Sequence, residues 1–131
     1  MRSGRRGAQA VEVAIALPLL LILFSGVVDL AELMMTRDAM TVAAADGCRA
    51  GSVMNQPKGE DPVATAIATA DQAWLAAERP QTAVFTAQIV GVKPNAMLVV
   101  HGEVSFSPWL GIVPMPASLA YDNTTRLTYQ P

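Results

Sequence analysis

The sequence predicts an α+β protein with a long N-terminal transmembrane helix, a second amphipathic helix and a three-stranded antiparallel sheet. Three observations predict this class. An uncharged apolar run comes early, helical spacing of small and apolar residues follows it, and three later runs alternate apolar with polar residues. We therefore divide the chain into a leader, a membrane-spanning segment and an α+β domain, at residues 1–7, 8–28 and 29–131.

The composition also indicates a membrane protein. Hydrophobic residues make up 52% of the 131 residues and charged residues only 15%, whereas a soluble domain has roughly 25% charged residues. Part of the apolar surface is therefore expected to face lipid. The net charge is −2, and the chain after the leader is acidic, with six basic and eleven acidic residues. This balance argues against the broad basic face that nucleic acid would need as a partner.

Residues 8–28 have the length and composition of a membrane span. They contain one charge, Glu12, and at about 1.5 Å per residue they cover roughly 31 Å, the thickness of a hydrocarbon core. Three arginines precede the segment, and Asp29 and Glu32 follow it. The positive-inside rule then predicts that the N-terminus is cytoplasmic and that the domain crosses the membrane.

Two alternatives accompany this interpretation. A cleaved secretory signal also has a basic start and an apolar run, but this run is long for one and no closely following A-x-A site is present. We therefore expect the segment to be retained as an anchor.

The carboxylate of Glu12 would add about 2.5–3.5 kcal/mol to the free energy of membrane insertion if it lay near the bilayer centre. Its place in the first turns leaves open that it only snorkels to the headgroups.

The first helix is predicted to continue beyond the membrane and to end near Gly51. Pro18 predicts either a simple kink or a point where the helix loosens during packing. Cys48 is the only cysteine and excludes an internal disulfide; we expect it in a helix contact, with an intermolecular disulfide as the alternative. One face of this part of the helix carries small and apolar residues: Met40, Ala43, Ala44, Gly47 and Cys48.

A second helix is predicted to start at Asp61 and Pro62. Aspartate is a favourable N-cap, and proline suits the first helical position. Pro80 should end the helix after Arg79. Its apolar face is formed by Val63, Ile67, Ala70 and Trp74.

Three strands are predicted at residues 83–89, 97–106 and 118–129, because side chains alternate along each of them. Residues 93–95 form a turn between the first two strands. Residues 123–126 interrupt the alternation of the third and predict a bulge or turn. The expected core-facing residues are Ala83, Phe85, Ala87 and Ile89 in the first strand, Leu98, Val100, Val104 and Phe106 in the second, and Leu119, Tyr121, Leu127 and Tyr129 in the third.

The sequence contains no constellation typical of catalysis. His101 is the only histidine and is expected on the wet face of a strand, without the orienting partner that a general base needs. Metal-ligand spacing and phosphate-binding loops are absent from the sequence. We therefore expect neither an enzyme nor a bound metal or cofactor.

The apolar loop from Pro108 to Pro116 is the predicted partner contact. Its large apolar side chains are unusual for a loop tip; an alternative is that the loop folds back onto the domain core. The residues expected to make the contact are Trp109, Leu110, Ile112 and Val113.

The start of the chain resembles a known family. Gly7 to Glu12 resembles the processing site of type IV pilins, in which a basic leader and a glycine precede a glutamate that enters an apolar helix. Residues 10–14 and 17–21, together with Gly26, Asp29 and the stretch 45–51, resemble TadE-like proteins of the tight-adherence (Tad/Flp) type IV pilus system.

This resemblance implies a minor pilin, or pseudopilin, that takes part in pilus assembly and in the associated adhesion or secretion. A prepilin peptidase would cut between Gly7 and Ala8, and Glu12 would act in assembly. The implied partners are other pilins, an assembly platform and a secretion ATPase, and the implied location is a bacterial inner membrane with a periplasmic domain. The alternative is a signal-anchored periplasmic binding module that is never processed.

Overall fold

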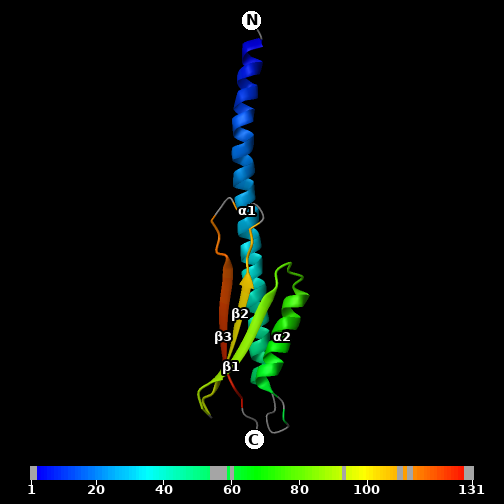
Figure 1. The fold of residues 1–131 in the computed structure, drawn as a ribbon, viewed down its shortest axis with the longest axis vertical. Helices are drawn as coiled ribbons and strands as arrows, with labels where there is room; N and C mark the ends of the chain where they lie inside the picture. Colours follow the sequence, from blue (N-terminus) through cyan, green and yellow to red (C-terminus); the bar gives the residue numbers. More distant parts are fainter. Residues whose placement is uncertain are drawn as a thin grey trace. The chain divides into compact units, whose positions relative to one another are not determined.

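The computed structural model describes residues 3–53, 59, 61–92, 94–108, 111 and 114–128, with the backbone alone for residues 3–6 and 8. Figure 1 shows two helices and a three-stranded sheet, which confirms the predicted α+β class. In chain order the elements are α1 (Ser3–Ser52), α2 (Pro62–Ala76), β1 (Ala83–Val90), β2 (Met97–Ser105) and β3 (Ser118–Arg126).

The chain forms two compact units, and the boundary between them falls inside α1. One unit contains Met1–Leu33 and Ser107–Met115; the other contains Met34–Phe106 and Pro116–Pro131.

In the first unit, α1 is exposed on every side from Gln9 to Phe24. Large apolar side chains lie open there, with Ile15 69% and Phe24 67% exposed. The helix is long and apolar enough to cross a membrane, and lipid is the solvent in which such a surface is stable. Pro18 lies inside α1, which stays α-helical on both sides of it.

The second unit contains an antiparallel meander in the order β1-β2-β3. The predicted turn is present among its described residues, because the Asn95 N–H donates to the Val92 carbonyl at 2.9 Å. The predicted core face of β2 is confirmed, since Leu98, Val100 and Val104 are buried.

The predicted interruption of the third strand is wrong. β3 pairs with β2 without a break, from Ser118 opposite Ser105 to Arg126 opposite Met97. Asn123 and Thr125 are half-buried in phase with Tyr121, so polar side chains continue the alternation where the sequence suggested that it stopped. Tyr129 lies outside the described residues.

Ile89 also departs from its prediction. It is in phase with the buried Phe85 but is 41% exposed, because neither helix covers that end of β1.

The buried face of α1 is the predicted one. Met40, Ala43, Ala44, Gly47 and Cys48 are all buried, and the helix ends at Ser52, next to the predicted Gly51. The predicted start of α2 is confirmed as well. The Asp61 carboxylate accepts a hydrogen bond from the Val63 N–H at 2.9 Å, and Pro62 occupies the first turn.

The buried face of α2 differs from the prediction. It is formed by Pro62, Ala66, Ala70 and Trp74, whereas Ile67 is only half-buried. The helix also ends earlier than predicted, at Ala76, and Glu78 has a positive φ of 50°. Small residues occupy the centre of the face because α1 lies too close for larger ones.

Two glycines of α1 set this close approach. A Cβ on Gly47 would lie 2.6 Å from the Ala66 carbonyl oxygen, and one on Gly51 would lie 2.5 Å from the Pro62 carbonyl oxygen and 2.6 Å from Leu98 Cδ2. These distances are shorter than van der Waals contact, so the α2 backbone occupies the space that a side chain would need. The two helices therefore meet backbone to backbone, over the Leu98 side chain of β2.

We predict that Gly51→Ala destabilises the domain by about 1–3 kcal/mol, because the added methyl group overpacks the contact with Pro62 and Leu98. Thermal unfolding of the full chain in detergent, followed by near-ultraviolet circular dichroism, measures the effect. Ala45→Leu, at an exposed position of the same helix, is the control and should change the stability by less than about 0.5 kcal/mol. Equal melting of both variants would contradict the backbone contact.

Candidate assembly site

Gly7 and Ala8 lie near the start of α1. Gly7 is exposed, and a Cβ built on it would meet no described atom within 4 Å. A glycine inside a helix costs roughly 0.5–1 kcal/mol relative to alanine. The fold of the described chain therefore gives no packing reason for glycine at this position.

Glu12 is exposed on α1, one turn or about 6 Å along the axis from Ala8. Its neighbours Val11 and Val13 are 60% and 61% exposed, so the carboxylate stands among apolar side chains that face outward. Among the side chains that the structure describes, none forms an ion pair with it. A carboxylate in this setting can bind a cationic group that arrives from another chain.

Beyond the predicted membrane segment, the exposed side of α1 carries both apolar and charged side chains. Asp38 and Asp46 are exposed there, and each lies four residues from Val42, on the same side of the helix. The exposed apolar side chains are Leu30 (48%), Met34 (61%), Met35 (55%) and Val42 (58%).

The predicted partner contact in the apolar loop is not tested by the structure. Trp109, Leu110, Ile112 and Val113 lie outside the described residues. In the same loop, Pro108 and Met115 are half-buried, and Gly111 and Pro114 are exposed.

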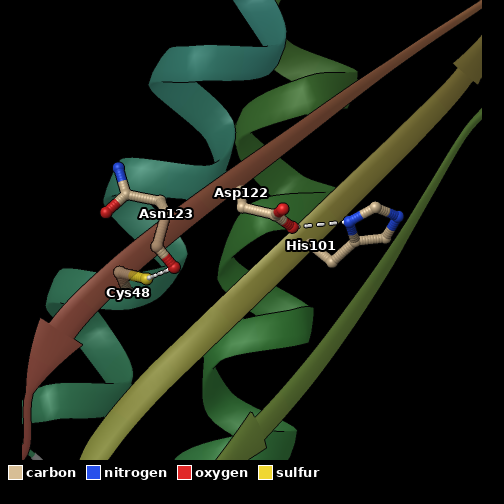
Figure 2. A network of polar contacts seen from close by, with 4 residues as sticks. All are labelled: Cys48, His101, Asp122 and Asn123. Atoms are coloured by element: carbon tan, nitrogen blue, oxygen red, sulfur yellow. Dashed lines mark hydrogen bonds and ion pairs between the residues drawn. The ribbon is translucent and has the colours of Figure 1, made fainter.

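His101 has a partner that the sequence did not reveal. Its Nδ1 lies 2.6 Å from Asp122 Oδ1 (Figure 2). The two residues stand directly opposite each other on β2 and β3. Only the register of β3 could have disclosed the pair, and the predicted interruption of that strand concealed it.

The pair lies on the open face of the sheet, where the His101 and Asp122 side chains are 42% and 69% exposed. Such a contact orients the imidazole ring and contributes about 0–1 kcal/mol. Acid–base catalysis would also require a reacting group held within hydrogen-bond reach. Among the described residues, no group of three or more metal-ligating side chains comes together.

Cys48 lies in the core, at 2% exposure. Its thiol donates to the Asn123 carbonyl oxygen at 3.2 Å (Figure 2), and burial raises the pKa of the thiol. A thiol in this position is closed to a second chain, so the structure supports the helix-contact interpretation over an intermolecular disulfide.

Comparison with known proteins found a similarity in the N-terminal third of the chain. Residues 7–49 match the family described as TadE-like protein. The match starts at Gly7, includes Glu12 and ends next to Cys48, so it covers the exposed part of α1 and most of its buried face. Neither curated proteins nor solved structures gave a match.

We predict that Cys48 in the folded full chain reacts with maleimide roughly 100-fold more slowly than an exposed cysteine, because the thiol must first be uncovered. Val42→Cys, on the exposed face of the same helix, supplies the comparison. Equal labelling rates of Cys48 and Val42→Cys at pH 7.5 would contradict the buried position.

Burial also makes the stability of the domain depend on pH, because it raises the pKa of the Cys48 thiol. The contribution of the protonated thiol to stability is fully present below the pKa of the unfolded thiol, about 8.5. It is lost as the pH rises through the higher pKa of the folded thiol.

Proposed function

We propose that this chain, whose residues 7–49 match the TadE-like family, is a minor pilin that takes part in assembling a tight-adherence type IV pilus. One observation carries the proposal: the family match begins at the glycine of a pilin-type processing site, at the head of an apolar helix that is exposed on every side up to Phe24. A structural role of this kind involves no catalysis.

Processing is the first step of the proposed role. A prepilin peptidase removes residues 1–7 and leaves Ala8 as the new N-terminus. Because a Cβ on Gly7 would meet nothing in the described chain, the requirement for glycine is attributed to the peptidase. Cleavage creates an α-amino group on Ala8, which is cationic at neutral pH, one turn from Glu12.

Assembly follows from this new charge pair. In the inner membrane, α1 packs laterally against the helices of other pilins, with the N-terminus toward the cytoplasm and the domain in the periplasm. The Glu12 carboxylate then binds the α-amino group of its own chain or of the neighbouring subunit. Exposed apolar side chains such as Met34 and Val42 extend the packing beyond the membrane, beside the exposed charges of Asp38 and Asp46. An assembly platform and a secretion ATPase supply the machinery, and adhesion or secretion is the output.

We predict that a host with a prepilin peptidase releases residues 1–7 and that Gly7→Leu blocks this release. The leucine side chain fills space that the peptidase needs, while the chain itself has room for it. Intact-mass analysis of the membrane fraction measures the result, with Ala10→Leu as a control that should still be cleaved. A full-length wild-type chain would support the unprocessed binding module instead.

We predict that the Glu12→Ala variant is inserted into the membrane, cleaved and stable, but no longer binds other pilins. The amount of other pilins that co-purify with it should fall by more than about tenfold. Removing one partner of a buried charge pair costs about 3–5 kcal/mol in general, and that cost arises only once neighbouring helices exclude water and lipid headgroups.

Val13→Ala is the matched control, because it shortens the adjacent exposed side chain without removing a charge. It should assemble as the wild type does, and Glu12→Asp should be partly active. Normal recovery of partners with Glu12→Ala would mean that Glu12 only snorkels to the headgroups.

A further inference from the structure

The outer side of β1 is open to another strand. β1 and β3 are the two edges of the sheet, with β2 between them (Figure 1). All eight residues of β1 pair with β2, without a bulge. Among the described residues, no backbone hydrogen bond links β1 to a segment other than β2. The backbone groups on the outer side of β1 are therefore available to a further strand.

β1 also lacks the features that keep an edge strand from pairing. Edge strands of natural sheets are commonly protected by charged side chains, by proline or by bulges. The sequence of β1, AVFTAQIV, contains neither a charge nor a proline. Two of its apolar side chains lie open on the face of the sheet away from the helices, with Val84 61% and Val90 48% exposed. An edge of this composition is suited to strand addition by another chain.

The direction of α1 limits how a second copy can supply that strand. A Cβ on Gly102, far along β2, would lie 3.3 Å from Met40 Cγ. Gly51, farther along α1, lies against Leu98 at the start of β2. In the second unit, α1 therefore runs antiparallel to β2. β1 and β3 are also antiparallel to β2, so both run in the same direction as α1.

This shared direction excludes pairing of β1 with β1 of a second copy. As antiparallel strands, the two would point their α1 segments in opposite directions, whereas copies anchored in one membrane by the same helix stand the same way up. As parallel strands, they would place the open face of one sheet beside the helix-covered face of the other. β3 of a second copy meets both conditions, because it runs parallel to β1 and leaves the helices of both copies on one face.

The polar side chains of the two edges match at the levels that β2 fixes. Thr86 and Asp122 both stand opposite His101, so they lie at one height in the sheet. A neighbour displaced sideways therefore places its Asp122 carboxylate beside the Thr86 hydroxyl, which can donate a hydrogen bond to it. Gln88 and Thr124 share the next level on the same face. Polar groups thus meet polar groups at the centre of the contact.

We propose that β1 of one copy of this chain pairs in parallel with β3 of a second copy, so that the two sheets become one. Val84 then lies beside Ala120, and Val90 lies beside the aliphatic part of Arg126. Because the contact uses two different edges, it can repeat along a row of copies. The proposal rests on the proposed function, which gives all copies one orientation in the membrane, and deepens it by naming a second copy as a partner of the domain.

Cysteine cross-linking of the full chain in membranes tests this pairing. Two differently tagged copies are co-expressed, one with Val84→Cys and the other with Ala120→Cys, and a mild oxidant is added. The mixed dimer should be at least about fivefold more abundant than that from Val84→Cys with Thr124→Cys, because only opposite residues come within disulfide reach. Thr124 is the matched control, since it is exposed on the same face of β3 but lies about 13 Å farther along the strand. Cys48 is buried and should remain unlinked.

Two results would overturn the proposal. One is a mixed dimer from Val84→Cys and Ala120→Cys that is no more abundant than the Thr124→Cys control. The other is a dominant dimer of Val84→Cys with itself, which would indicate that β1 pairs with β1.

A charge placed on the edge supplies a second test. Ile89 is 41% exposed on the helix-covered face of β1, so the domain has room for a lysine there. In the joined sheet that lysine would stand beside Thr125 of the neighbour. Adding Ile89→Lys should lower the mixed dimer more than about fivefold, whereas Val92→Lys, beyond the end of β1 and 81% exposed, should not. An unchanged yield with Ile89→Lys would also overturn the proposal.

These readouts separate the strand pairing from the proposed pilin role. Loss of the cross-link with normal processing and normal Glu12-dependent co-purification would overturn the strand pairing alone. A retained cross-link in a chain that is never cleaved would overturn the pilin role alone.

Discussion

The fold of the domain depends on the backbone contact between α1 and α2. Gly47 and Gly51 are four residues apart and lie on one face of α1, against Ala66 and the first turn of α2. With no side chain at either glycine, α2 can lie flat on α1, and the buried Trp74 of α2 then reaches the Phe85 ring of β1 in an edge-on contact. The close approach of the α1 and α2 backbones thus brings α2 into contact with the sheet.

The surroundings of α1 change along its length, from an exposed apolar segment to a segment with one buried face. All sides of α1 are exposed up to Phe24, and one face is buried from Ser25 onward. The first buried positions are polar, namely Ser25, Asp29 and Thr36, and apolar residues take over from Met40. The Ser25 and Thr36 hydroxyl oxygens are buried without a hydrogen-bond partner among the described residues, which is unfavourable for the free energy of folding.

The exposed surface of α1 changes along the helix. From Ala10 to Phe24 it is apolar on every side apart from Glu12, which suits lateral packing with other helices in a membrane. Farther along, exposed charges such as Asp38 and Asp46 lie beside exposed apolar residues such as Val42. The apolar surface that suits helix packing is therefore concentrated in the membrane segment.

The sequence by itself determined the elements and the membrane helix, because these follow from local periodicity, capping residues and the length of the apolar run. The face from Met40 to Cys48 and the cap at Asp61 are examples. Only the tertiary structure decided which apolar residues are covered. Ala66, rather than the predicted Ile67, lies at the centre of the buried face of α2 because the two glycines of α1 lie opposite it. Ile89 is exposed because the helices end before they reach it. The contact between His101 and Asp122 depends on the register of β3. Such facts depend on contacts between distant segments, which periodicity does not encode.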